Sequence, residues 1–192
     1  MSYFIKTCSP EKADAALQDV YAKTQSAFGM IPKVFVAQSI RPDLLDPMVS
    51  YVNRLMIETH ALPRKTKELI AAYVSTINKC NYWIDAHSAM VMTQGQSRKE
   101  VEEILNDIEG TELNDEKTRH LLQLAGKTTK HSYKVTEDSI KQLRQADCTD
   151  EEIFEAIAVT SLFSYMDRMA DALGAPVEGF RDMVEQMQNT EK

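Results

Sequence analysis

The sequence predicts an all-α protein with about eight to ten helices, and three observations favour this class. Apolar residues recur at three- and four-residue spacing through most of the chain, which is typical of helices with one buried face. No segment shows the alternating β-branched pattern of a strand. The few glycines and prolines lie where helices are expected to begin or end. Because no linker-like or repeated tract interrupts it, the 192-residue chain predicts one domain with frayed ends at about 1–8 and 187–192.

In the first half of the chain, prolines mark the helix starts. Pro10 follows the capping residue Ser9, and Pro42 and Pro63 open two further helices, because proline is tolerated in the first helical turn. Asn78 is a good N-cap and separates two helices, which places Cys80 in the first turn of the second. We expect helices over about 9–28, a short one after 32, 42–58, 63–78 and 80–92.

In the second half, hydroxyl residues mark the starts. Ser97 and Glu100 form a capping box, and Thr136 and Thr149 are N-caps. Gly174 ends the long helix that Thr149 begins, and Pro176 opens the last one. We expect helices from 97 onwards, over 114–129, 137–146 and 149–173, and from 176 to about 186.

One pair of helices carries an acid, a thiol and an imidazole. Cys80 and His87 are seven residues apart and therefore share one helix face, with Trp83 between them. Glu68 belongs to the preceding helix, and an antiparallel pair would bring it beside His87. A helix N-terminus favours the thiolate of Cys80, so the pattern indicates a carboxylate that orients a histidine, which in turn assists a thiol. Each residue also has a structural interpretation: a buried cysteine, a core tryptophan, a hydrogen-bonded histidine.

This segment resembles the carboxymuconolactone decarboxylase superfamily, specifically its alkylhydroperoxidase D-like, peroxidase-related branch. The pattern of that branch is Glu, eleven residues, Cys-x-x-Cys, three residues, His, and Glu68, Cys80 and His87 fall in register with it. The flanking stretches 29–32, 62–68 and 163–174 agree, so that the resemblance covers about residues 10–180. It implies an alkylhydroperoxidase D-like helical bundle. Asp167 stands where the branch more usually has Asn.

The chain departs from the branch at the second cysteine of the motif, which is Trp83 here. In the family the two cysteines cycle between dithiol and disulfide, and that cycle is closed to Cys80. The two other cysteines are Cys8 and Cys148, and the sequence leaves open whether either approaches Cys80 as a resolving cysteine.

Three functions remain open. The first is thiol-dependent (peroxiredoxin-type) peroxide reduction, in which Cys80 is oxidised to a sulfenic acid and reduced by an external thiol, with Glu68 and His87 as the proton relay. The second is a non-redox, carboxymuconolactone decarboxylase-like enzyme in which Glu68 and His87 are acid and base. The third is a non-catalytic oligomeric protein whose pocket, lined by Tyr73, Tyr82, Trp83 and His87, binds a small aromatic or apolar ligand.

Composition limits the setting of the protein. The net charge of −7, from 29 acidic and 22 basic residues with no basic stripe, argues against binding to nucleic acid or to an anionic membrane. Three scattered cysteines and an N-terminus without a signal-peptide pattern predict a cytoplasmic protein. His60, His120 and His131 are dispersed, so we expect no metal and no cofactor.

A homo-oligomer is also expected. The family forms dimers, trimers or hexamers, and the apolar stretches 89–92 and 157–166 suit an interface as well as a core.

Overall fold

The computed structural model describes residues 3–58, 61–111 and 115–190. Ten α-helices lie in these ranges, with no strand among the residues described, so the all-α prediction is confirmed. Their bounds are α1 Ala15–Phe28, α2 Lys33–Val36, α3 Pro42–Val52, α4 Arg64–Asn78, α5 Asn81–Met92, α6 Arg98–Asn106, α7 Glu116–His131, α8 Glu137–Gln145, α9 Asp150–Leu173 and α10 Phe180–Thr190. Short 3₁₀ turns lie at Pro10–Lys12 and Ser132–Lys134, and the π-helical turn η2 (Asn53–Ile57) continues α3.

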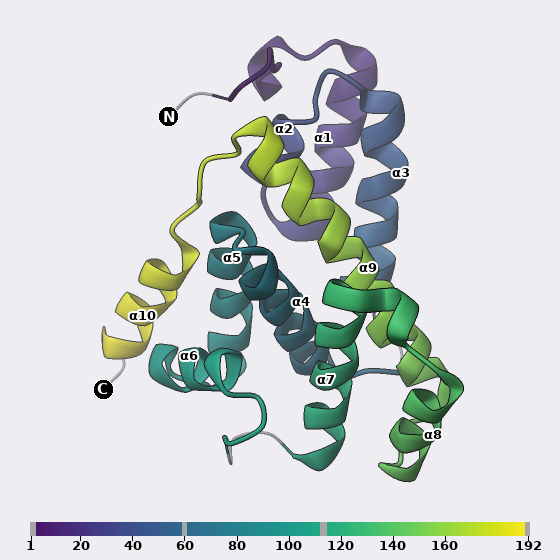
Figure 1. The fold of residues 1–192 in the computed structure, drawn as a ribbon. Helices are drawn as coiled ribbons and strands as arrows, with labels where there is room; N and C mark the ends of the chain where they lie inside the picture. The colour runs from purple at the N-terminus through teal and green to yellow at the C-terminus, as the bar shows by residue number, and fades with distance from the viewer. Residues whose placement is uncertain (1–2, 59–60, 112–114, 191–192) are drawn as a thin grey trace.

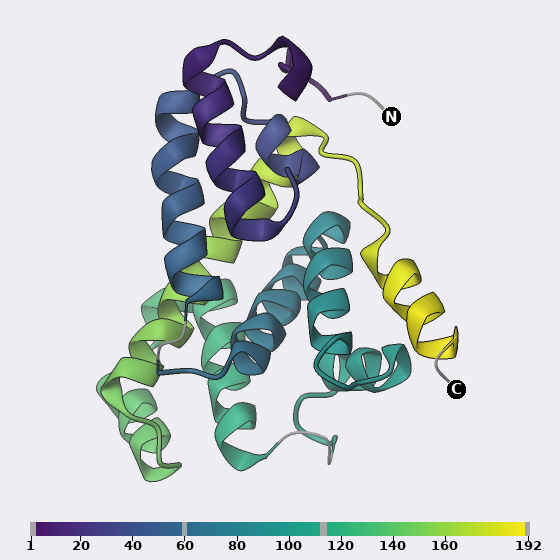
Figure 2. The same cartoon turned by 180° about the vertical axis from the view of Figure 1, so that it is seen from behind.

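The hairpin of α4 and α5 lies at the centre of the bundle (Figure 1). The long helix α9 crosses it, α7 packs on α4 and α9, and α1 and α3 form a second layer at one end (Figures 1 and 2). Helix α10 lies at the edge beside α5. The core between these layers contains fully enclosed side chains such as Val49, Ile70 and Met166.

The helix starts follow the predicted capping signals at three positions. Ser97 and Thr149 each form a capping box with a glutamate, and Thr136 forms one with Ser139. In each case a side-chain oxygen satisfies a backbone N–H that the first helical turn leaves unpaired.

Other helix boundaries differ from the prediction. The first helix begins after Asp14, because its carboxylate accepts from Leu17 N and a 3₁₀ turn precedes it. The seventh begins after Asp115, and the predicted start at Asn114 lies outside the described residues. The last helix begins at Phe180 rather than after Pro176, because the acceptor for its first N–H groups comes from Asp85 of α5.

The stretches expected to suit an interface are mostly core. Ala89, Val91 and Met92 are buried, as are Phe163 and Met166. The homo-oligomer therefore remains a prediction. No helix that the structure describes is long and apolar enough to cross a membrane.

Candidate active site

Glu68 and His87 form a buried pair across the α4–α5 hairpin. Glu68 lies one turn into α4 and His87 in the middle of α5, and their side chains are 1% and 9% exposed. Glu68 Oε2 is 2.5 Å from His87 Nδ1. Arg64, one turn before Glu68, donates from Nε to the other carboxylate oxygen. The antiparallel hairpin thus brings together the two residues that the sequence predicts to be neighbours.

The protonation of this pair follows from its contacts. Burial raises the pKa of the Glu68 carboxyl, but the His87 imidazole and the Arg64 guanidinium outweigh it and hold the pKa below its usual value. An ionised carboxylate only accepts hydrogen bonds, so His87 Nδ1 donates to Glu68. In the neutral imidazole this tautomer leaves the lone pair on Nε2, a buried nitrogen that has no hydrogen-bond partner.

Aromatic rings surround the imidazole. The Trp83 ring stacks on His87 with a centroid distance of 5.1 Å and an interplanar angle of 19°. The Phe163 ring from α9 meets His87 edge-on at 4.2 Å and Trp83 edge-on at 5.3 Å. Trp83 Nε1, like His87 Nε2, is buried without a partner. These rings fix the imidazole in a water-poor setting.

A small cavity lies against this cluster. Its volume is about 120 Å³, and its wall combines side chains from α1, α2, α3, η2, α4, α5, α9 and α10. Almost all of its surface is apolar. It is lined by Phe28, Pro32, Phe35, Val52, Met56, Ile57, Arg64, Glu68, Trp83, Ala86, His87, Met90, Phe163 and Phe180.

Of the three aromatic residues predicted to form a pocket, only Trp83 lines this cavity. The Tyr82 hydroxyl instead donates to Glu178 at 3.1 Å and accepts from Val34 N at 3.3 Å. The Tyr73 ring packs against Gly126 of α7. Tyr82 directly precedes Trp83 and is therefore about 100° away around the helix, so the two side chains point in different directions.

Cys80 lies apart from the cavity. It is the N-cap of α5 and fully buried, because Lys79 ends α4 in a left-handed conformation with φ 61°. This corrects the prediction that Asn78 caps the helix and that Cys80 lies in its first turn. Burial raises the pKa of the Cys80 thiol well above its usual value, and the carboxylates of Asp171 and Asp167 raise it further. The thiolate expected from a helix N-terminus is therefore disfavoured.

The other two cysteines have separate surroundings. All three cysteines are free thiols. Cys8 is half-buried. Its backbone N–H donates to Ser39 Oγ, and its carbonyl accepts from the Tyr21 hydroxyl. Cys148 is buried in the turn before α9, where burial raises the pKa of its thiol.

Asp167 is a buried acid whose carboxylate is hydrogen-bonded to two uncharged side chains. Its carboxylate oxygens are 2.8 Å from Ser75 Oγ and 2.7 Å from Asn78 Nδ2. Burial raises its pKa. Ser75 Oγ is also 2.9 Å from the Ala71 carbonyl, so its single proton is shared between two acceptors. Donation from Ser75 and Asn78 to the carboxylate offsets part of the rise in the pKa of Asp167.

Three residues of the site were not among the predicted site residues. Arg64 precedes Glu68 by four residues, a spacing that signals an ion pair on a helix. Phe163 and Phe180 come from α9 and α10, and no sequence spacing links them to His87.

The described residues contain no cluster of three or more His, Cys, Asp or Glu side chains able to hold a metal. His120 is near Glu116, and His131 packs on Tyr133. His60 lies outside the described residues.

Comparison with known proteins gives consistent matches. Residues 42–114 match the model of the Carboxymuconolactone decarboxylase family. An alkyl hydroperoxide reductase of Mycobacterium tuberculosis is 29% identical over 93 residues, which are 48% of this chain and 27% of that protein. This chain thus spans only about a quarter of the length of that curated relative.

Two solved structures match over most of the chain. One is an uncharacterized peroxidase-related protein from Ralstonia eutropha, described as an alkylhydroperoxidase AhpD core, with a TM-score of 0.84 and 24% identity over 95% of this chain and 96% of that chain. The other is an uncharacterized peroxidase-related protein from Silicibacter sp., with a TM-score of 0.77 and 28% identity over 88% of this chain and 90% of that chain. The match to the Ralstonia eutropha protein, at 24% identity, shows that the two chains share a fold.

Proposed function

We propose that this chain, as a member of the carboxymuconolactone decarboxylase superfamily in its alkylhydroperoxidase D-like branch, is a non-redox enzyme that transfers protons on a small organic substrate. One observation carries the proposal: the lone-pair nitrogen of His87 is unpartnered inside an apolar cluster while Glu68 holds the opposite ring nitrogen. This is the arrangement of a general base with its orienting carboxylate.

The proposed step needs no co-reactant. His87 Nε2 takes a proton from an acidic C–H, N–H or O–H bond, whose electron pair stays on the substrate. The imidazolium that forms is stabilised by the Glu68 carboxylate, and Arg64 keeps that carboxylate ionised. The same nitrogen then returns the proton to the substrate at the same or another atom. The low dielectric of the apolar wall strengthens each of these electrostatic interactions.

The position of Cys80 supports a role without the thiol. Cys80 does not line the cavity, and it begins the helix about 10 Å along the axis from His87. A nucleophile and its base require hydrogen-bond distance.

Deuterium exchange into cyclopentanone tests the proposal, because a base that reaches an α-hydrogen replaces it with deuterium from D₂O. We expect the wild-type protein to accelerate this exchange. Glu68→Gln and His87→Gln should lose two to four orders of magnitude, on the scale known for general bases and their orienting acids. Cys80→Ser, the control, should retain the activity. An absence of exchange in the wild type, or undiminished exchange in Glu68→Gln, would contradict the proposal and favour a non-catalytic binding protein.

Thiol-dependent peroxide reduction is the second candidate, favoured by the placement of Cys80 at the N-terminus of α5 and by the names of the relatives. In this reaction the Cys80 thiolate attacks the peroxide O–O bond and becomes a sulfenic acid, the alcohol leaves, and two external thiols reduce the sulfenic acid and become a disulfide while water is released. The burial of Cys80 and its raised pKa weigh against it.

Consumption of tert-butyl hydroperoxide with dithiothreitol separates the candidates. We expect no Cys80-dependent consumption by the wild type. Activity that disappears in Cys80→Ser would replace the first proposal by the second. Activity that appears only in Trp83→Cys would indicate that the relay is intact and that Trp83 has removed it from redox chemistry.

A further inference from the structure

The cavity beside His87 has room for one ring. Its volume of about 120 Å³ is somewhat smaller than an engineered apolar cavity of about 150 Å³ that stays dry and binds benzene. A five-membered ring with one substituent has about as many heavy atoms as benzene. A fused two-ring molecule needs more space than these walls leave.

The charges of the wall are already balanced. The lining groups Arg64 and Glu68 form an ion pair, and Glu68 also binds His87. The remaining lining side chains are uncharged and mostly aromatic or aliphatic. A charged ligand would lose its hydration without gaining an unpaired counter-ion, which costs several kcal/mol. An uncharged ligand is therefore favoured.

Two buried polar atoms in the wall residues still lack partners. In the neutral imidazole His87 Nε2 is an acceptor, because Nδ1 donates to Glu68, and Trp83 Nε1–H is a donor. Native structures rarely leave such atoms unpaired, and each one favours a ligand group of opposite character. A hydroxyl or N–H group donates to the first, and a hydroxyl oxygen also accepts from the second.

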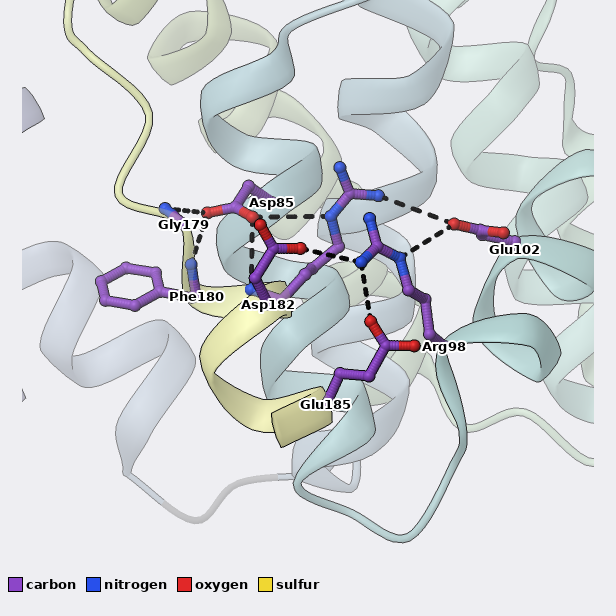
Figure 3. Close-up of polar contacts among 8 residues, drawn as sticks. Asp85, Arg98, Glu102, Gly179, Phe180, Asp182 and Glu185 are labelled. Carbon is purple, nitrogen blue, oxygen red and sulfur yellow. Dashed lines mark hydrogen bonds and ion pairs between the residues drawn. The ribbon is translucent and has the colours of Figure 1, made fainter. Parts of the chain in front are cut away.

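Helix α10 supplies the part of the wall that is easiest to move. Phe180 is its first residue and lines the cavity, yet α10 buries no residue fully. The connection from α9 begins at Gly174 and ends at Gly179, both with positive φ (68° and 84°). Figure 3 shows how polar contacts with Asp85 and Arg98 hold the start of α10 against α5 and α6. Because His87 Nε2 is shielded from solvent, a ligand that enters must pass a wall side chain, and Phe180 stands on a helix that buries no residue fully.

We propose that the cavity binds an uncharged single-ring molecule bearing one hydroxyl, carbonyl or N–H group, and that Phe180 sets the upper size limit of the ligand. This assignment rests on the proposed function, because it names the substrate class of the same site. It also makes Phe180 a specificity-determining residue.

Tryptophan fluorescence reports on the site directly, because Trp83 is the only tryptophan in the chain. Three optically transparent probes are titrated: cyclopentanol, cyclopentanecarboxylate and decahydronaphthol. We expect a saturable change with cyclopentanol, and binding at least tenfold weaker for the carboxylate and for the two-ring alcohol. Equal or tighter binding of either of these two, or no saturable response to cyclopentanol, would overturn the assignment.

Variants test the role of Phe180. Phe180→Ala should bind decahydronaphthol at least tenfold more tightly than the wild type does. Met187→Ala is the matched control, since Met187 is on the same helix, 64% exposed and outside the cavity, and should leave selectivity unchanged. If Phe180→Ala loses α10 altogether, Met90→Ala enlarges the same cavity from α5 and should shift selectivity in the same direction. Unchanged selectivity in both enlarged variants would refute the size limit.

The binding and exchange experiments fail separately. Selective binding of cyclopentanol without deuterium exchange in cyclopentanone would refute the proposed catalysis and leave the ligand class standing. Exchange by a protein that binds the carboxylate as well as the alcohol would refute the ligand class alone.

Discussion

Replacement of Asp85 by alanine is expected to release α10 from the bundle. The Asp85 carboxylate lies on α5, is almost fully buried and accepts from the backbone N–H groups of Gly179, Phe180 and Arg181 at 2.9, 2.9 and 3.2 Å. It therefore acts as an N-cap supplied by another helix (Figure 3).

The size of the effect follows from this cap. Loss of an N-cap side chain costs about 0.5–2 kcal/mol, and hydrogen bonds to a charged group are at the upper end of such values. A cost of about 2 kcal/mol raises the undocked population about 30-fold. An 11-residue helix is marginal in isolation, so undocked α10 is expected to unfold. The loss stays local, because α10 contributes no fully buried residue to the core.

Native-state hydrogen exchange measures this directly. In Asp85→Ala, the amides of α10 should exchange about 30-fold faster while those of α4 and α9 keep their protection. Asp85→Asn retains an acceptor oxygen and should recover part of the protection. The control is Asp182→Ala, which removes an ion-pair partner of Arg98. The Asp182 side chain is 70% exposed, so its loss should change the exchange rates of α10 by much less. Unchanged α10 exchange in Asp85→Ala, or an equal rise in α4 and α9, would refute the capping argument.

Three further predictions concern buried polar groups. Asp167→Asn should increase the free energy of unfolding at neutral pH. The pKa of Asp167 in the folded protein is raised above 3.8, so the folded protein holds a proton that the unfolded chain has released. The stability of the wild type therefore falls as pH rises from about 4 through the raised pKa. Urea unfolding at acidic and neutral pH should show that the free energy of unfolding of the variant depends less on pH than that of the wild type. An identical pH dependence would contradict the prediction. Lys67→Met should destabilise by about 2–3 kcal/mol in urea unfolding, because the Lys67 Nζ bonds to the carbonyls of Leu55 and Glu58 are lost, whereas an effect near zero would mean that water replaces them. Thiol labelling followed by mass spectrometry should modify half-buried Cys8 first and Cys80 only on unfolding; early labelling of Cys80 would contradict its burial and raised pKa.

Local signals in the sequence carried much of the fold. Ser97, Thr136 and Thr149 begin helices as predicted, because a capping side chain satisfies backbone groups within three residues and needs no distant partner. The pairing of Glu68 with His87 was also predictable, since a short connection between two helices makes them antiparallel neighbours.

The helix carrying Cys80 shows where local reasoning ends. The spacing of Cys80, Trp83 and His87 fixes their angles around one helix, but not which neighbouring helix meets each side chain. Helix α9 places Phe163 against His87, in the middle of α5. The same helix places the acids Asp167 and Asp171 near Cys80, at the N-terminus of α5. Burial raises the pKa of the thiol, and these two acids raise it further, against the effect expected from the helix end.

The sequence by itself determined the class, the capped helices and the Glu68–His87 pair, because those depend on contacts within one helix or one hairpin. Only the tertiary structure decided which residues enclose the imidazole. Phe163 contacts the imidazole and Phe180 lines the adjoining cavity, both from helices more than 70 residues away along the chain. Tyr73 and Tyr82, which are close in sequence, face other neighbours. Side-chain direction follows helix rotation, and the rotation is set by how all the helices bury their apolar faces together.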